Sequence, residues 1–314
     1  MAVYFSIFLV IVTVLTGIVW LADKFYLASQ RQLKLTTAQA QCDTTLSAEV
    51  IEKITEPSAL VDTSVQIFPV IAFVLILRSF LWEPFQIPSG SMMPTLLDGD
   101  FILVNKFNYG LRDPVTQTKF FQIGEPQRGD VFVFKYPNEP QIDYIKRVIG
   151  LPGDRIIYRN KSLYIKPACI NSDKKCPDFE QVVTEFKKPS DSPDGSYGLS
   201  RYVSKMPNKT HDILIDNQVL PRGQYFCSDA QGHLCQQAGT HQDEFVVPKG
   251  HYFAMGDNRD NSADSRYWGF VPEENLVGQA VFIWMSFDFE RTPDDFLPHW
   301  IPTGVRFSRL GAIN

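Results

Sequence analysis

Residues 128–137 read RGDVFVFKYP, and residues 143–154 read DYIKRVIGLPGD. Each stretch joins a run of β-branched and aromatic residues to a turn that contains glycine, the pattern of a short strand. The same strand pattern recurs at Phe101–Val104, Phe253–Met255 and Ala280–Met285. Short strands separated by turns predict an all-β architecture for this part of the chain.

The composition agrees with strands and turns. The chain has 314 residues, of which 13% are aromatic and 21 are proline, which favours strands over a helical bundle. Its formal net charge is -5 and its pI is about 5.6. An acidic chain without a basic stripe lacks the electrostatic footprint of a nucleic-acid-binding protein.

Two apolar stretches near the N-terminus predict membrane-spanning helices. Residues 1–22 carry no charged side chain and would form roughly 30 Å of helix, enough to cross the hydrocarbon core. The alternative, a cleaved signal peptide, needs a basic leading region that this chain lacks. Residues 64–82 form the second candidate, although Pro69 and Arg78 weaken it, and a buried core helix is the alternative.

The distribution of basic residues predicts the orientation of these spans. Lys24, Arg31 and Lys34 follow the first span, and no Lys or Arg lies between Glu83 and Asn105 after the second. Since basic residues stay on the cytoplasmic side, we expect residues 23–63 to form a cytoplasmic loop. The N-terminus and everything after the second span would then lie outside.

Residues 167–250 lack the strand pattern of the sequence on either side. They contain the four cysteines of the part of the chain that we expect to lie outside the membrane. Cys169 with Cys176, and Cys227 with Cys235, form close pairs that suit disulfides in an oxidising compartment. His233 and His241 make zinc binding an alternative for the second pair, but the spacing Cys-x5-His-x-Cys-x5-His matches no usual zinc module. We interpret the region as an inserted subdomain held by two disulfides.

The stretch at residues 88–96, PSGSMMPTL, predicts a stiff turn that presents a serine hydroxyl close to a membrane surface. No histidine lies beside it, so a Ser-His-Asp triad has no local support. A buried lysine can replace histidine as the base, because burial in apolar surroundings lowers its pKa. Lys146 lies among apolar residues in a predicted strand, although that segment alone is more typical of a surface lysine.

A third segment, residues 256–269, reads GDNRDNSADSRYWG and follows a predicted strand. Its short polar and charged residues can form turns and ion pairs, and a polar loop on a rigid scaffold often builds a site. Taken by itself, such a run is more often a solvated loop or a calcium-like turn, although it lacks the spacing of an EF-hand.

Together these three segments closely resemble the bacterial type I signal peptidase family. The resemblance includes the serine turn, residues 99–104, 128–137, 144–154 and 256–269, in matching order and spacing, and the two-span form of Gram-negative bacteria. It implies a mainly β fold: an antiparallel catalytic β-domain of residues 83–166 and 251–314, the smaller insertion 167–250, and two N-terminal transmembrane helices. It implies no cofactor and no metal.

The resemblance also implies roles for individual residues. Ser91 would be the nucleophile and Lys146 the general base, with Ser262 orienting the Lys146 amine. Ser89 and the Ser91 N–H would form the oxyanion hole. Tyr144 would pack near Lys146, and Asp264 with Arg266 would form a supporting ion pair. Shallow substrate pockets would be lined by Phe85, Ile87, Met92, Leu96 and Ile145.

The implied activity is removal of signal peptides from exported preproteins, after small residues of the Ala-x-Ala type, through an acyl-enzyme. The implied location is the bacterial inner membrane with the catalytic domain in the periplasm, and the partners are signal peptides, the lipid bilayer and the export machinery. Penicillin-binding enzymes place the lysine three residues after the serine, where this chain has Pro94. A membrane-anchored scaffold would not explain the three polar segments.

Overall fold

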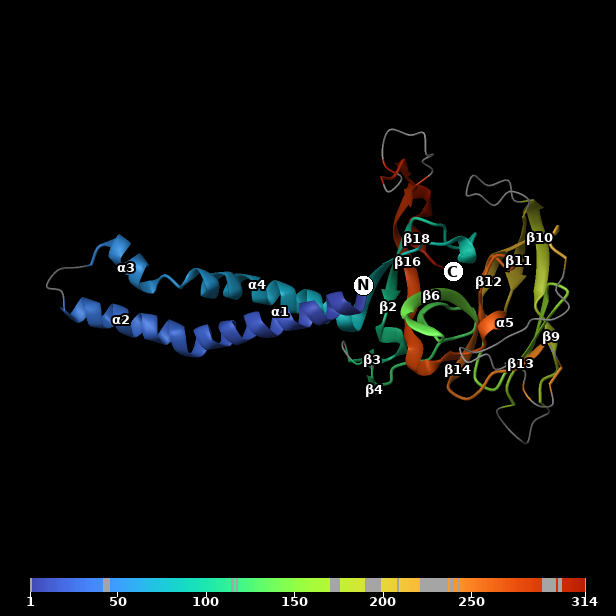
Figure 1. Ribbon diagram of the computed structural model, residues 1–314, viewed down its shortest axis with the longest axis horizontal. Coiled ribbons are helices and arrows are strands. Elements are labelled where there is room, and N and C mark those ends of the chain that lie inside the picture. The colour runs from blue at the N-terminus through green and yellow to red at the C-terminus, as the bar shows by residue number, and fades with distance from the viewer. Residues whose placement is uncertain are drawn as a thin grey trace. The chain divides into compact units, whose positions relative to one another are not determined.

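The computed structural model describes residues 2–41, 46–113, 116, 118–169, 176–189, 199–207, 209–220, 237, 240–241, 243–289, 298 and 301–313. The chain divides into a helical unit, residues 1–81 with residues 112–117, and a β unit, residues 82–111 and 118–314. Figure 1 shows helices α1, α2, α3 and α4 in blue to cyan and most of the strands in green to red. Each unit is described by itself below.

The helical unit is built from α1 (Ala2–Ala22), α2 (Ala28–Gln41), α3 (Ala48–Thr55) and α4 (Ala59–Ile76). A π-helical turn, Asp23–Leu27, joins α1 to α2, so the helix does not stop at Ala22, the end of the predicted span. A second π-helical turn, Leu77–Leu81, extends α4. By length and composition two helices could cross a membrane, Phe5–Gln41 with 37 residues and Ala59–Leu81 with 23.

Helices α1 and α4 pack against each other within this unit. The rings of Trp20 and Phe68 have centroids 5.2 Å apart. Gly17 lets the two helices approach, because a Cβ added there would lie only 2.8 Å from the Phe68 ring. The contact between the two apolar helices therefore depends on a small residue opposite a large one.

The main sheet of the β unit is antiparallel. Its strands follow the order β1-β2-β16-β5-β6-β14-β15, and β17 and β18 also pair with β16. The strands are β1 (Trp82–Gln86), β2 (Asp100–Asn105), β5 (Val131–Tyr136), β6 (Glu139–Gly150), β14 (His251–Met255), β15 (Val271–Pro272), β16 (Leu276–Asp288), β17 (Gly304–Val305) and β18 (Gly311–Ala312). The mainly β, antiparallel fold and the two apolar N-terminal helices predicted from the sequence are confirmed.

Three smaller sheets complete the β unit. A four-stranded sheet has the order β13-β7-β8-β9, a three-stranded sheet the order β10-β11-β12, and β3 pairs with β4. Their strands are β3 (Leu111–Arg112), β4 (Lys119–Phe121), β7 (Arg155–Arg159), β8 (Ser162–Lys166), β9 (Glu180–Gln181), β10 (Val183–Pro189), β11 (Ser200–Lys205), β12 (Thr210–Ile215) and β13 (Glu244–Val246). The four-stranded sheet thus begins at Arg155, before the predicted insertion, and the domain boundaries stay a prediction.

Strand β5 shows why its sequence is an unbroken apolar run. Val131 and Val133 belong to one core cluster, and Phe132 and Phe134 to another. Because successive side chains point to opposite faces of a sheet, a strand covered on both faces must be apolar at every position. Strand β2 instead alternates between buried and half-buried residues.

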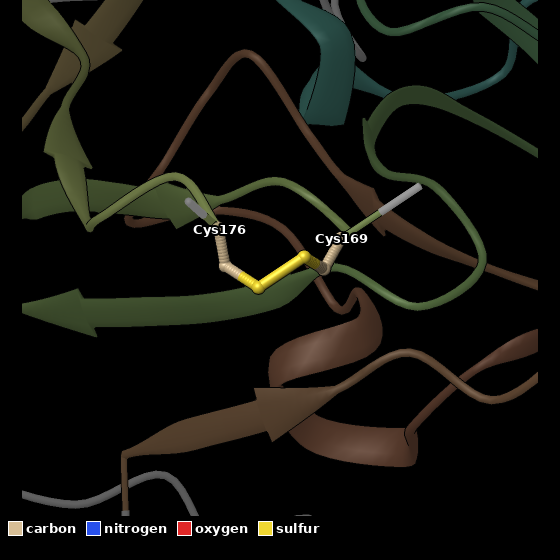
Figure 2. Close-up of a disulfide and its surroundings, with 2 residues drawn as sticks. All are labelled: Cys169 and Cys176. Atoms are coloured by element: carbon tan, nitrogen blue, oxygen red, sulfur yellow. A yellow bond between two sulfur atoms is a disulfide. The ribbon is translucent and has the colours of Figure 1, made fainter. Parts of the chain in front are cut away.

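Cys169 and Cys176 form a disulfide, with an S–S distance of 2.13 Å and a Cα–Cα distance of 5.1 Å (Figure 2). The bond spans the residues between β8 and β9, at the edge of the four-stranded sheet. The second predicted pair, Cys227 with Cys235, lies outside the described residues, as does His233.

Candidate active site

The serine turn is held in place by buried side chains on both sides of the nucleophile. Ile87, Met92 and Leu96 are buried in the core cluster that also contains Val131 and Val133. The backbone of Ile87 bonds to both Asp100 and Gly99, which ties the start of the turn to β2. Between these anchors, the 3-10 turn Gly90–Met92 carries Ser91, which is only half-buried. The hydroxyl of Ser91 therefore stands on a rigid support beside solvent.

Lys146 on β6 meets this serine. Its Nζ lies 2.8 Å from Ser91 Oγ and donates to the Ile145 carbonyl at 2.9 Å. The residue is 5% exposed. Burial lowers the pKa of Lys146 to about 8, while Asp264 and Asp257 oppose the shift and Arg266 supports it. An amine with that pKa is partly neutral near physiological pH and can accept a proton from a hydroxyl.

Aromatic side chains cover the lysine. The Tyr144 ring centroid lies 5.3 Å from Lys146 Nζ. Tyr144 stacks on Tyr136 with centroids 4.4 Å apart, and its ring also meets Trp268 at 6.4 Å edge to face. This aromatic wall keeps water from the amine on one side, which is the condition for the low pKa.

Ser89 lies on the open side of the nucleophile. Its Oγ is 3.4 Å from Ser91 Oγ, and its side chain is exposed. A hydroxyl there and the Ser91 backbone N–H belong to the same turn and can face one carbonyl oxygen of a bound substrate. The role of Ser89 as an oxyanion donor stays a prediction.

Asp264 and Arg266 form a fully buried ion pair in the third segment. Arg266 Nε donates to Asp264 Oδ1 at 2.7 Å and its Nη2 to Oδ2 at 2.8 Å. Asp264 also accepts from the Gly256 N–H at 3.0 Å and precedes the short helix α5 (Ser265–Trp268) as its N-cap. Burial alone would raise the pKa of Asp264, but Arg266, the Gly256 N–H and the Ser262 hydroxyl together lower it. The pair therefore holds the segment in one conformation.

Ser262 is buried next to the nucleophile, and no hydrogen bond joins its hydroxyl to the lysine among the described residues. A Cβ added to Gly256 would meet both Ser262 Oγ and the Ser91 carbonyl, so only glycine allows this close approach. Among the described residues, Lys146 Nζ has its hydrogen-bond contacts with Ser91 and Ile145. The predicted hydrogen bond from Ser262 to the amine stays a prediction.

The proposed pocket residues differ in accessibility. Ile87, Met92, Leu96 and Ile145 are all buried in one core cluster, and Phe85 packs against it while partly exposed. Met92 and Leu96 are 0% exposed, so they support the floor of the site beneath its surface. Their role in selecting substrate side chains stays a prediction.

Sequence reasoning missed two residues that hold the serine turn from behind. Asn258 donates its backbone N–H to the Ser91 carbonyl and its side-chain amide to the Gly90 carbonyl, both at 3.1 Å. Next to it, Asp257 receives a bidentate contact from Arg147 at 2.9 and 2.7 Å, and Thr95 Oγ1 donates to the same carboxylate at 2.5 Å. Both residues stand in the polar segment 256–269, but nothing in that pattern distinguishes them from their polar neighbours.

Among the described residues, no histidine forms a hydrogen bond with Ser91. His211 is buried near Asp257, with Nε2 3.7 Å from Oδ1, and burial lowers its pKa to about 3. His251 contacts the Lys249 carbonyl. In the part of the chain that the structure describes, the basic group at the serine is Lys146.

Comparisons with known proteins agree with this geometry. The family profile "Signal peptidase, peptidase S26" matches residues 60–285, and a signal peptidase I from Buchnera aphidicola is 40% identical over 332 residues, covering 100% of both chains. This chain belongs to the signal peptidase I family. Another member, from Pseudomonas aeruginosa, is also 40% identical over 100% of both chains. Members of this family are serine endopeptidases, and so is this chain.

A solved signal peptidase I from Enterococcus faecalis is 28% identical and covers 50% of this chain and 98% of its own, with a TM-score of 0.26. The fold assignment rests on the antiparallel strand pairing described above rather than on this superposition.

Proposed function

We propose that the protein is a membrane-anchored peptidase that removes N-terminal signal peptides from exported preproteins, using Ser91 and Lys146 as a catalytic dyad. The observation that carries the proposal is the 2.8 Å contact between Ser91 Oγ and the buried Lys146 Nζ. The family relationship supports the substrate class, because the relatives from Buchnera and Pseudomonas are signal peptidases.

The first chemical step follows from the state of the lysine. With a pKa of about 8, about one Lys146 amine in ten is neutral at pH 7, whereas an ordinary lysine is neutral in only about one in three thousand. The neutral amine takes the proton from Ser91 Oγ as the oxygen attacks the carbonyl carbon of the scissile bond. Lys146 then gives the proton to the leaving amine, and the signal peptide stays attached to Ser91 as an ester.

The second step releases the signal peptide. A water molecule that loses its proton to Lys146 attacks the ester, and Ser91 leaves with that proton. In both steps the carbonyl oxygen gains negative charge, which the Ser89 hydroxyl and the Ser91 N–H would stabilise. One such donor is worth about 3–4 kcal/mol of barrier.

The topology supports binding of an extended substrate. Strand β1 lies at an edge of the main sheet, and β14 pairs with β6 only from Arg147 onward. The part of β6 before Lys146 is therefore paired only with β5 among the described strands. A substrate strand that adds to such an edge brings its scissile bond to Ser91, and small residues near the bond would fit against Phe85 and Ile145.

The helices supply the proposed anchor. Phe5–Gln41 and Ala59–Leu81 are long and apolar enough to span a bilayer, and the positions of Lys24, Arg31 and Lys34 favour a cytoplasmic loop between them. The catalytic β unit would then lie on the periplasmic face of the inner membrane, where the cut site of a translocating preprotein emerges. The bilayer and the export machinery are the partners that this location implies.

The test is cleavage of a purified preprotein by the detergent-solubilised full-length protein, compared with Ser91→Ala. We expect one cut after an Ala-x-Ala-type site, located by mass spectrometry, and loss of that cut in the variant. If a folded Ser91→Ala protein cleaved the preprotein at the same rate, Ser91 would not be the nucleophile. No cleavage by the folded wild type would refute the proposed substrate class.

A further inference from the structure

A pocket of about 270 Å³ lies beside the end of the serine turn, and neither Ser91 nor Lys146 lines it. The residues that line it come from the serine turn, β11, β12, β16 and the segment around β18: Pro94, Thr95, Arg201, residues 210–212, Ile283 and residues 312–313. Ligand sites in proteins usually enclose about 300–1,000 Å³. The pocket is therefore suited to a short segment of chain and is too small for a folded partner.

Arg201 brings an incompletely paired guanidinium to this pocket. Its Nε is buried without a hydrogen-bond partner among the described residues, and its Nη1 lies 3.9 Å from Asp212 Oδ2, beyond hydrogen-bond distance. Asp212 instead accepts a hydrogen bond from Lys187 Nζ at 2.8 Å. A guanidinium cannot lose its proton, and a buried donor without a partner costs free energy. Arg201 therefore lacks a partner such as a carboxylate, which would match its geometry.

The charges around the pocket favour an acidic occupant. Lys187 and Asp212 pair with each other and largely cancel. His211 is neutral at physiological pH, since burial lowers its pKa to about 3. Among the described residues that line the pocket, Arg201 carries the charge that remains, so the pocket attracts a carboxylate and repels a cation.

Strand β12 also offers free backbone groups at the pocket. On the side away from β11, the Leu214 N–H donates to the Asp257 carbonyl and the Leu214 carbonyl accepts from the Arg259 N–H, both at 2.9 Å. Because backbone groups alternate between the two edges of an antiparallel strand, the N–H and carbonyl of Asp212 point to the same edge as those of Leu214. Among the described residues, no backbone group pairs with them. An extended segment can therefore add to β12 at Asp212.

The opposite walls of the pocket are fixed by hydrogen bonds. The Thr95 carbonyl accepts from Arg309 at 2.8 Å, and the Thr95 hydroxyl donates to Asp257. The Ile313 N–H donates to the Val281 carbonyl at 3.0 Å. Binding does not have to order these walls first, which removes one of the usual costs of association.

Two connections keep the pocket close to Ser91. Pro94 follows Ser91 by three residues, so their Cα atoms are within about 11 Å of each other. Asn258, whose N–H donates to the Ser91 carbonyl at 3.1 Å, forms a β-bridge with Leu214, two residues from Asp212. An extended substrate advances about 3.3 Å per residue, so about the third to sixth residue after the scissile bond can reach the pocket.

We propose that this pocket binds the mature part of the preprotein, as an extended segment that adds to β12 at Asp212 and places an acidic side chain on Arg201. The inference rests on the proposed function, because the mature part begins at the bond that Ser91 cleaves. The signal peptide lies on the side of Phe85, and the chain beyond the scissile bond continues past the serine turn. Arg201 then selects preproteins with an acidic residue early in the mature part.

The experiment is cleavage of matched preproteins by the full-length protein in detergent. The two substrates of each pair differ only in Glu or Gln at one position, from the third to the sixth residue after the cut. At one of these positions we expect Glu to lower KM about five- to tenfold relative to Gln, with kcat unchanged within about twofold. Arg201→Gln should lose this preference. Lys205→Gln, an exposed lysine on the same strand outside the pocket, is the matched control and should keep it.

Two kinetic results would overturn the proposal. One is equal cleavage of the Glu and Gln substrates by wild type at every position, and the other is a rise in KM of equal size for both substrates in Arg201→Gln. If Arg201→Gln does not fold by circular dichroism, Thr210→Trp decides the question. Its indole, at an exposed position of the pocket, should fill the space and remove the same preference, and an unchanged preference would refute the site.

Crosslinking tests the same site without activity. A preprotein with a photoreactive phenylalanine next to the acidic residue, held uncleaved by the Ser91→Ala protein, should crosslink to residues 210–212, and Thr210→Trp should weaken that crosslink. Crosslinks confined to other parts of the protein would contradict the proposal. Absence of any cleavage by the folded wild type would instead refute the proposed function, so the two failures are distinguishable.

Discussion

Lys146 is the residue whose environment changes its chemistry most. A lysine on a strand surface would be charged at pH 7, but here burial favours the neutral amine at Ser91. The residue itself was predicted through the family resemblance, because a lysine among apolar neighbours in a β-rich run also suits a surface position. The distance to Ser91 was not predictable from the residues, since 55 positions separate the two in the chain.

Replacing the amine should abolish cleavage. We expect Lys146→Met to lose activity by about a thousandfold or more, because the hydroxyl of Ser91 is then without a base. Lys146→Arg should not restore it, since a guanidinium stays protonated. The measurement is preprotein cleavage, with circular dichroism to verify folding. Normal cleavage by Lys146→Met would point to a different base.

The pKa of Lys146 also predicts a pH dependence of stability. Because the folded-state pKa is lowered to about 8, the folded protein binds fewer protons than the unfolded chain between about pH 8 and pH 10.5. The free energy of unfolding should therefore rise with pH across that window, and the cost of the buried charge is fully present below it. Lys146→Met should melt a few degrees higher than wild type at pH 7 and lose this advantage towards pH 10.5. Thermal unfolding of both proteins at the two pH values measures this, and equal melting temperatures at pH 7 would contradict it.

The serine turn shows how an element without regular secondary structure becomes rigid. Its apolar side chains enter the core, and its backbone carbonyls accept hydrogen bonds from Asn258. The strands around it were predictable from β-rich runs and turn signals. The contacts of Asn258 were not, because a short polar residue in a polar loop has many possible partners until the loop is folded against another segment.

Removal of the Asn258 amide should loosen this turn. We expect Asn258→Ala to lower kcat about tenfold with little change in KM, because the Gly90 carbonyl loses its donor and the nucleophile is less well positioned. Asn261→Ala, at an exposed position of the same loop, is the control and should be near wild type. Steady-state kinetics on both variants decides this, and equal effects would indicate a general disturbance of the loop.

A second support comes from the C-terminal end. Arg309 donates to the Thr95 carbonyl at 2.8 Å and to Asp100 at 2.7 Å, and Asp100 is fully buried. Arg309→Ala would leave this carboxylate without its closest cation and should cost about 1–3 kcal/mol of stability. The exposed pair of Lys205 and Glu185 offers the control, since Lys205→Ala should have little effect. Urea unfolding of the two variants measures the difference, and equal midpoints would argue against the role of Arg309.

The chain combines two apolar helices with a β unit that carries Ser91 and Lys146. If the positive-inside pattern sets the topology, protease added to spheroplasts should digest the part that follows Trp82 and leave the loop between the spans intact. Antibodies against tags inserted after Gln41 and at the C-terminus would follow the two parts by blotting. If protease digests the tag after Gln41 and leaves the β unit intact, the protein has the opposite orientation to the one predicted.

The pattern of residues along the chain determined the mainly β class, the two apolar helices and the three polar segments, because strand texture, hydropathy and turn chemistry are local properties. Only the tertiary structure decided which polar residues meet. It paired Arg147 with Asp257 and Arg266 with Asp264, and buried Met92 and Leu96 beneath the site. The reason is physical: an ion pair, a lowered pKa or a buried floor depends on distance and on exclusion of water, and both arise only when strands remote in the sequence pack together.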